Sequence, residues 1–283
     1  MIDELRKGNR NTSLFITHHL SFIIIFRRLL KSRRLIWALA TKELRARYVG
    51  SVGGVAWNVI QPLALIAIFT FVFSYLLKMR EFGGGKNYIF YLVSGLLPWN
   101  AFQEALQRSS NIFVENSRLI QRIPFPIESF VAQAMLTSLL NLVIGLAILI
   151  IFMPILGAPY GPSLLLLPVA IILEALLMMG PALALASLTP FWRDVPPFTS
   201  LGLFIGFWLT PIVYMPGLLP GGLARWFALN PFYHLAMFFR ASFTGAGFPS
   251  ARAMVGLLAA SIFMLIIGAR IFFKTHRKVP ELL

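Results

Sequence analysis

The chain has 283 residues, of which 58% are hydrophobic and only 12% are charged, and its formal net charge is +15. Soluble domains carry about 25% charged residues, so this composition indicates an integral membrane protein and excludes an ordinary soluble enzyme. The absence of cysteine excludes disulfides, thiolate metal sites and a cysteine nucleophile. No nucleic-acid-binding motif accompanies the positive charge, so we expect no nucleic acid partner.

Residues 1–52 are interpreted as a cytoplasmic amino-terminal segment, because they hold eleven lysines and arginines. Within it, the residues on one face of a helix spanning residues 29–48 are Leu29, Ile36, Trp37, Ala40 and Leu44. This pattern predicts an amphipathic interface helix that lies on the cytoplasmic membrane surface. A helix packed on a soluble domain is the alternative, for which the chain leaves no room. The other residues assigned to the interface helix are Lys31, Arg34, Lys42, Arg45 and Arg47.

Residues 53–283 are interpreted as a transmembrane domain with six helices, since one span needs about 20 predominantly apolar residues. The second span is the weakest, because we expect Pro98 to break it. With both termini inside, 19 lysines and arginines lie on the inner side and 6 on the outer side, which orients both termini to the cytoplasm. The expected fold is an all-α integral membrane protein. The predicted spans are about 55–77, 88–107, 127–156, 163–189, 197–215 and 253–273.

Residues 216–245, between the fifth and sixth spans, are apolar but repeatedly interrupted by proline and glycine. The segment is too broken for one span and too apolar for a solvated loop. It predicts a re-entrant pair of short helices whose backbone is buried in protein or lines a cavity. Two helices lying flat at the membrane interface are the alternative.

No motif for catalysis or cofactor binding is present. The nearest string to a P-loop, residues 83–87, lacks the serine or threonine that would hold Mg²⁺, so the chain is not expected to hydrolyse ATP itself. The four histidines are scattered and no HExxH or GxSxG occurs. We therefore predict no catalytic residue, no metal site and no cofactor on this chain.

Two kinds of residue within the spans are candidates for function. Glu174 lies near the middle of the fourth span, where an ionisable group suggests a conduit or gating role. Its alternative, a neutral hydrogen-bonded carboxyl, is also the interpretation for Glu104 near a helix end. Aromatic residues near span ends form an interface belt, or line a path that suits sugar rings. The candidate conduit or substrate residues are Trp57, Tyr91, Trp99, Phe102 and Glu174.

Five short motifs follow one another along the chain: RYVGSVGGVAW from Arg47, GLLPWNAF from Gly95, NSRLIQRIPFP from Asn116, FWRDV with the later TPIVY, and NPFYHL with Arg240. In this order and spacing they resemble the permease subunit of type-2 ABC exporters, in the polysaccharide-export branch that includes O-antigen and teichoic-acid exporter permeases. The resemblance covers nearly the whole chain from about residue 35. The segment before residue 29 departs from it and has no assigned role.

The resemblance implies two permeases of this kind, a homodimer, working with two separate P-loop ATPase subunits that hold ATP and Mg²⁺. It implies export of a lipid-linked glycan across the cytoplasmic (inner) membrane. Residues 116–126 resemble the coupling helix that docks into a groove of the ATPase. The residues this implies for ATPase coupling are Asn116, Arg118, Leu119, Ile120, Arg122, Ile123 and Pro124. Arg193 and Asp194 are added to this set as a hypothesis.

Arg193 and Asp194 lie in the short turn between the fourth and fifth spans. They either anchor this turn among lipid headgroups, or contact the ATPase or brace segment 116–126. Asp194 is also placed to cap the fifth helix, where the dipole favours negative charge.

Three other function classes stay open. The same scaffold would serve an exporter of a drug or a simple lipid. An ion-coupled transporter usually needs buried charge pairs, and Glu174 has no matching cation in the sequence. A membrane polymerase or ligase would need titratable residues in outer loops, and residues 157–162 carry no charge.

Overall fold

The computed structural model describes residues 25, 27–46, 56–76, 78, 88–122, 126–154, 160–215, 226–227, 229–244, 249–276 and 278–283. All regular elements among these residues are helices, as the composition predicted. They are α2 (Arg33–Ala46), α3 (Trp57–Thr70) with the π-helical continuation η2 (Phe71–Leu76), α4 (Tyr88–Glu115), α5 (Ser117–Arg122), α6 (Glu128–Phe152), η5 (Pro162–Leu166), α7 (Leu167–Leu188), α8 (Val195–Leu209), α10 (Pro231–Thr244), α11 (Ala251–Thr275) and α12 (Val279–Leu282).

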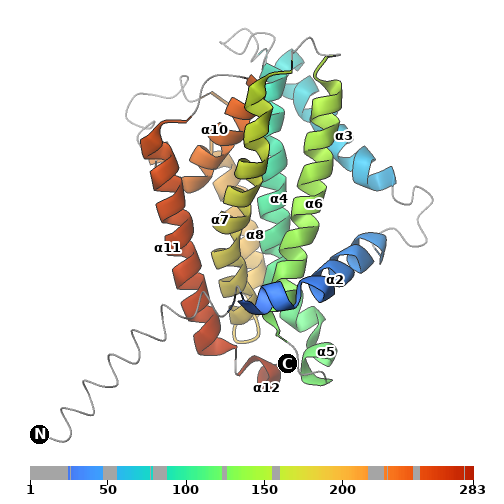
Figure 1. Ribbon diagram of the computed structural model, residues 1–283, viewed down its shortest axis with the longest axis vertical. Helices are drawn as coiled ribbons and strands as arrows, with labels where there is room; N and C mark the ends of the chain where they lie inside the picture. Colours follow the sequence, from blue (N-terminus) through green and yellow to red (C-terminus); the bar gives the residue numbers. More distant parts are fainter. Residues whose placement is uncertain are drawn as a thin grey trace, which may run out of the picture.

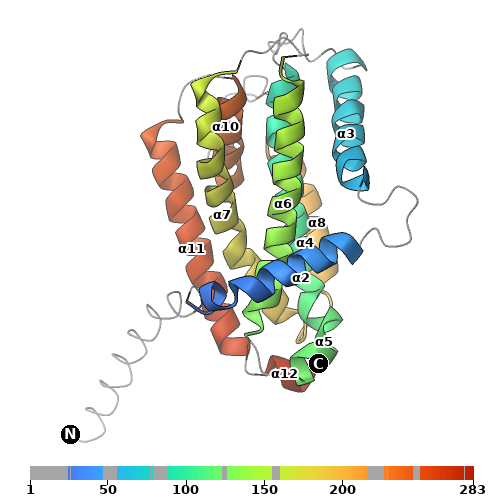
Figure 2. The ribbon, with the colours of Figure 1, turned by 45° about the vertical axis from the view of Figure 1, so that its right-hand side comes forward.

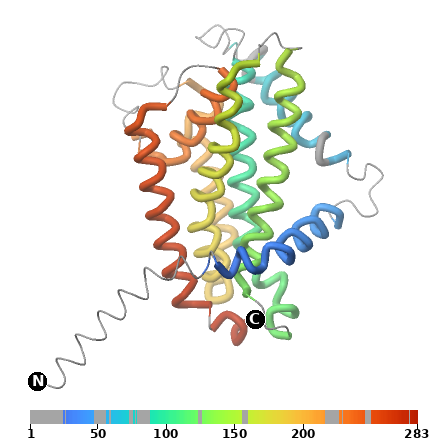
Figure 3. Tube along the Cα trace, viewed as in Figure 1, coloured from blue at the N-terminus to red at the C-terminus, as the bar shows by residue number. Residues whose placement is uncertain are grey.

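The long helices α4, α6, α7, α8 and α11 stand side by side in one bundle (Figure 1). Successive long helices run in opposite directions (Figure 3). The short helix α10 lies at the end where α4 and α11 begin, which we call the α10 end. Helices α5 and α12 lie at the opposite end, the α5 end (Figure 1). Helix α2 crosses α6 obliquely nearer the α5 end (Figure 2).

Three helices of the described part are long and apolar enough to cross a membrane: α6, the combined helix Pro162–Leu188, and α11. They coincide with the third, fourth and sixth predicted spans to within a few residues. The protein is therefore a multi-pass membrane protein. Helices Ile60–Thr70 and Val195–Leu209 are apolar but shorter, so the count of six spans stays a prediction.

Helix α4 corrects the predicted second span, which was expected to end at residue 107 and to break at Pro98. The helix is continuous over 28 residues, with Pro98 inside it and buried. A proline removes one backbone hydrogen bond, and neighbouring helices in a bundle can compensate for that loss. No further helix breaker separates residue 107 from Glu115, so the helix continues to that point. At about 1.5 Å per residue it is about 42 Å long.

Helix α8 ends at Leu209, six residues before the predicted end of the fifth span. The early end of α8 has a local cause. Pro211 has no N–H to donate to a helical hydrogen bond, and it disfavours a helical backbone conformation at Thr210. Thr210 accordingly takes an extended conformation, with φ −107° and ψ 129°. Residues 210–213 are nevertheless buried without regular structure. Fifteen helical residues reach only about 22 Å, so this segment completes the length of the bundle.

Helices α7 and α11 cross in close contact at two glycines. A Cβ atom on Gly180 would lie 2.2 Å from the carbonyl oxygen of Met264, and one on Gly268 would lie 2.0 Å from the carbonyl oxygen of Gly180. The two backbones touch directly, as small residues permit in membrane helix pairs.

Helix α2 lies within the predicted interface helix 29–48. Ile36 and Ala40 of its predicted apolar face are buried, whereas Trp37 of the same face is 54% exposed. The four described basic residues of the predicted set are exposed, as an interfacial helix requires. They are Lys31, Arg34, Lys42 and Arg45, and Arg47 lies outside the described residues.

Candidate functional site

The predicted coupling segment begins at a bend between α4 and α5. The Asn116 side-chain amide donates to the Ile112 carbonyl at 2.8 Å, and the Asn116 carbonyl accepts from the backbone N–H groups of Leu119 and Ile120. Ile120 is buried and anchors α5 to the bundle, while Leu119 is 43% exposed. Helix α5 therefore presents a basic and partly apolar surface, which consists of Arg118, Leu119 and Arg122.

Helix α5 accounts for only part of the predicted coupling segment. Ile123 and Pro124 lie outside the described residues. The helix is also shorter than the segment 116–126, since it ends at Arg122.

A pocket of about 380 Å³ at the α5 end joins three parts of the chain. It is lined by Asn111 and Ser117 around the start of α5, by Arg193 from the turn before α8, and by Leu282 and Leu283 at the carboxyl end. The structure thus brings Arg193 beside the predicted coupling segment. This arrangement is consistent with the predicted contact between the Arg193 turn and segment 116–126.

Asp194 is the N-cap residue of α8, but its side chain makes no cap hydrogen bond, so the predicted side-chain cap is wrong. A capping carboxylate accepts from the second or third helical N–H group. Pro196 and Pro197 occupy those two positions and have no N–H to donate.

A half-buried polar network holds α2 against α4 and α6, and it was not predicted from the sequence. The Glu43 carboxylate pairs with the Arg108 guanidinium and accepts a 2.7 Å hydrogen bond from the Gln133 side chain. Glu104, one turn before Arg108, accepts from the Asn141 amide at 2.9 Å. Glu43 is the sole acidic residue of segment 29–48, and that isolation was the available signal.

Replacing Glu43 with alanine is expected to loosen α2 from the bundle. The change leaves Arg108, which is 27% exposed, without this partner and removes an acceptor from Gln133. Breaking a well-buried pair costs about 3–5 kcal/mol, and partial exposure reduces this to about 1–3 kcal/mol. Limited proteolysis within α2 should accelerate accordingly. Glu281→Ala, which removes an exposed carboxylate of α12, is the control, and equal proteolysis of both variants would contradict the role of the network.

The predicted conduit residues Trp99 and Phe102 lie in one aromatic cluster between α4, α8 and α10. The Trp99 ring meets the Phe232 ring edge-on at 4.8 Å and the Phe207 ring at 5.9 Å. Gly206 permits this approach, since a Cβ there would lie 3.1 Å from the indole. Trp99 is only 3% exposed, so in a single chain it acts as core packing. A conduit role for it stays a prediction.

The other three conduit candidates lie apart from that cluster. Trp57 is 40% exposed on α3, and Tyr91 lies at the α10 end. Glu174 is fully buried in α7, and neither of its carboxyl oxygens has a hydrogen-bond partner among the described residues. An isolated ionised carboxylate would be costly in such a place. The described residues also hold no group of three or more potential metal ligands.

Helix α10 is fixed at its start by Asn230 and Pro231. The Asn230 Oδ1 accepts from the Phe232 N–H at 2.9 Å as an N-cap, and proline is suited to the first helical position. The Asn230 Nδ2 donates to the Thr210 hydroxyl at 2.7 Å, which ties α10 to the end of α8. Helix α10 is the regular element in the described part of the predicted re-entrant segment 216–245, which comprises residues 226–227 and 229–244.

Arg240 is buried to 3% exposure and holds the irregular segment after α8. Its Nη2 donates to the carbonyls of Pro211 and Ile212 at 2.6 and 3.0 Å, and its Nε donates to the Tyr91 carbonyl at 3.2 Å. The guanidinium carbon also lies 3.7 Å from the centre of the Tyr91 ring. Buried non-helical backbone needs such donors. The sequence predicted no such role for Arg240, which belongs to the fifth motif and is one of the six basic residues assigned to the outer side.

Comparison with known proteins identifies the family. The family model described as "ABC-2 type transporter" matches residues 34–244. An "O-antigen export system permease protein RfbA" of Klebsiella pneumoniae is 26% identical over 88% of this chain and 95% of its own length. The protein of the same name from Myxococcus xanthus is 26% identical over 92% of this chain and 99% of its length. The "Polysialic acid transport protein KpsM" of Escherichia coli matches over 40% of this chain and 44% of its length, at 26% identity.

The family match runs from the second residue of α2 to the end of α10, and it includes the turn at Arg193 and the contacts of Arg240. The chain belongs to the ABC-2 type transporter family.

Proposed function

We propose that this chain is the membrane-spanning permease subunit of an ATP-driven exporter that moves a lipid-linked polysaccharide, such as an O-antigen, out of the cytoplasm. The observation that carries the proposal is its similarity to two O-antigen export permeases over 95% and 99% of their lengths. The partial match to a polysialic acid transport protein supports the same substrate class. ATP and Mg²⁺ belong to a separate P-loop ATPase subunit.

The α5 end faces the cytoplasm and receives the ATPase in this proposal. Exposed Arg118, Leu119 and Arg122 offer the partner a basic surface with an apolar centre. Helix α4 then transmits the movement, because it runs from the bend at Asn116 to the α10 end without interruption. There the hydroxyls of Tyr88 and Tyr91 donate to the carbonyls of Val213 and Tyr214. A push on α5 therefore reaches the irregular segment after α8.

The conduit forms between two copies of this chain in this proposal. Helix α8 supports it, because one of its faces is apolar and uncovered in the single chain. Phe198 is 71% exposed and Phe204 62% exposed. The further exposed apolar residues of this face are Leu201, Ile205, Trp208 and Leu209.

Arg193→Ala is expected to uncouple ATP hydrolysis from transport. Arg193 lines the pocket beside Ser117 but is exposed, so the bundle folds without it. Loss of a charged contact of about 1.5–3 kcal/mol corresponds to at least about a tenfold fall in glycan export per ATP. The measurement compares hydrolysis and glycan transport in the purified complex.

The control for this experiment is Arg270→Ala, which removes an exposed arginine of α11 that does not line the pocket. It should retain normal coupling. If Arg193→Ala also transports as much glycan per ATP as the unaltered protein, the turn is only an anchor in the headgroup region.

A further inference from the structure

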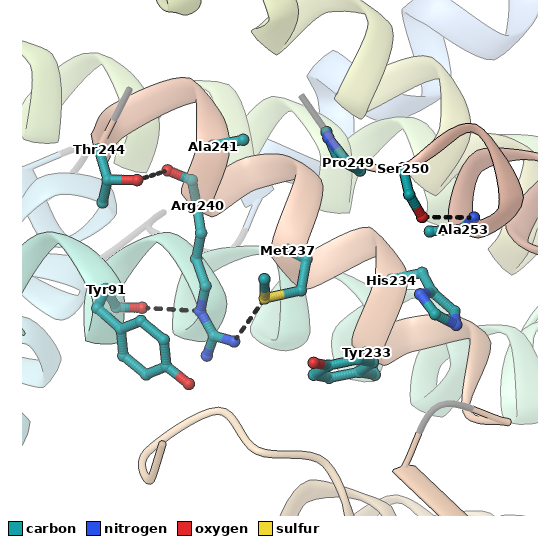
Figure 4. Close-up of a pocket in the computed structure, with 10 residues that line it drawn as sticks. All are labelled: Tyr91, Tyr233, His234, Met237, Arg240, Ala241, Thr244, Pro249, Ser250 and Ala253. Carbon is teal, nitrogen blue, oxygen red and sulfur yellow. Dashed lines mark hydrogen bonds between the residues drawn. The ribbon is translucent and has the colours of Figure 1, made fainter. Parts of the chain in front are cut away.

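A second pocket, of about 430 Å³, opens at the α10 end between α4, α10 and the start of α11 (Figure 4). Its size falls within the range of about 300–1,000 Å³ typical of small-ligand sites. None of its lining residues is acidic. The polar residues that line it are Tyr91, Tyr233, His234, Arg240, Thr244 and Ser250.

Arg240 gives this pocket a buried positive charge. Its Nε and Nη2 are occupied by three backbone carbonyls, but the acceptor of Nη1 among the described residues is the Met237 sulfur at 3.8 Å. A thioether is a weak acceptor, and no carboxylate of the described part pairs with this guanidinium. Carbonyl dipoles solvate the charge without neutralising it. The pocket therefore favours an anion.

The start of α11 adds a second, independent feature that favours an anion. Ser250 is the N-cap of this 25-residue helix, and its hydroxyl accepts from the Ala253 N–H at 3.3 Å. Ser250 and Ala253 both line the pocket. The first turn of a helix presents backbone N–H groups and the positive end of the helix dipole, which together bind phosphate and carboxylate groups.

We propose that this pocket binds the phosphate group of a membrane lipid. A phosphate offers several strong acceptor oxygens, which match the Arg240 Nη1 and the phenol of Tyr233. The remaining wall is apolar, including Met237, Pro249 and Ala253, which suits the glycerol and upper acyl region of a lipid. The inference goes beyond the proposed export function, because the ligand is a lipid of the membrane and not the exported polymer.

The test adds dihexanoyl phosphatidylglycerol to the purified complex of this chain with its ATPase and counts bound lipid by native mass spectrometry. Ala253→Phe fills the pocket while leaving Arg240 and its carbonyl contacts in place, and Ala253→Val fills it less. Each copy of the unaltered chain in the complex should bind one lipid. Ala253→Phe should weaken binding by at least about tenfold, and Ala253→Val by less.

The control is Arg252→Ala, which removes an exposed arginine at the start of α11 that does not line the pocket. It should change binding by less than about fivefold. Unchanged binding in Ala253→Phe, or an equal loss in Arg252→Ala, would overturn the proposal, because general surface attraction would then explain the lipid. If inorganic phosphate alone binds as tightly as the lipid, the pocket takes free phosphate and the lipid assignment is wrong. Each binding result is independent of whether the complex exports a glycan.

Discussion

Gly268→Ala is expected to stop α7 and α11 from closing on each other and to remove most of the folded protein. The new methyl group would lie 2.0 Å from the carbonyl oxygen of Gly180, which is backbone and cannot rotate away. The helices would have to separate along their whole crossing. Overpacking a tight contact with one methyl group costs about 1–3 kcal/mol, and a rigid backbone neighbour puts this case at or above the upper end.

The measurement for this variant is the yield of monodisperse protein together with its midpoint of thermal unfolding. Gly256→Ala is a matched control in the same helix, because a Cβ there meets nothing within 4 Å. It should leave the protein unchanged or stabilise it by about 0.5–1 kcal/mol, as alanine does in a helix interior. Equal behaviour of the two variants would show that the close crossing of α7 and α11 is not required for folding.

Arg240→Met is expected to release residues 210–215 from the bundle. Methionine fills much of the same volume but donates no hydrogen bond, so the carbonyls of Tyr91, Pro211 and Ile212 lose a donor together. The Pro211 carbonyl still accepts from the Tyr91 hydroxyl at 3.3 Å, and the Tyr91 carbonyl from the Ser94 hydroxyl at 3.3 Å. The Ile212 carbonyl keeps no such donor among the described residues, and one buried unsatisfied group costs about 1–3 kcal/mol. Residues 210–215 would then become accessible to solvent and to reagents.

Thiol labelling detects this release directly, because the chain has no native cysteine. Val213→Cys places a thiol at a residue that is 1% exposed, so it should resist labelling in the otherwise unaltered chain. Combined with Arg240→Met it should label rapidly, and combined with Arg252→Met it should stay protected. Slow labelling in the Arg240→Met background, with an unchanged unfolding temperature, would mean that other contacts hold the segment.

The parts of the fold that the sequence predicted well depend on local pattern. Helices α6, α7 and α11 are long uninterrupted apolar runs, and such runs define spans by length alone. One error arose where tertiary contacts override a local signal, and the other where a local signal was missed. Pro98 was expected to break a helix that the surrounding bundle keeps intact. Pro211 was overlooked within an apolar run, although it ends α8.

For the candidate sites, too, features within one short segment were predicted, whereas contacts between distant residues were not. The turn at Arg193 was predicted as a possible brace for segment 116–126, and it lies beside Ser117 in the structure. The pairing of Glu43 with Arg108, and of Arg240 with the segment after α8, joins residues far apart in the chain. Spacing within one helix carries no signal for such pairs, and both were missed.

The proposed dependence of transport on a separate ATPase is tested most directly by reconstitution. This chain would be purified with and without a candidate P-loop ATPase, and the movement of a lipid-linked glycan across proteoliposomes would be measured with ATP and Mg²⁺. We expect transport only when both proteins and ATP are present, with no requirement for an ion gradient. Transport by this chain alone, driven by a proton gradient and abolished by Glu174→Gln, would contradict its assignment as an ATP-driven export permease.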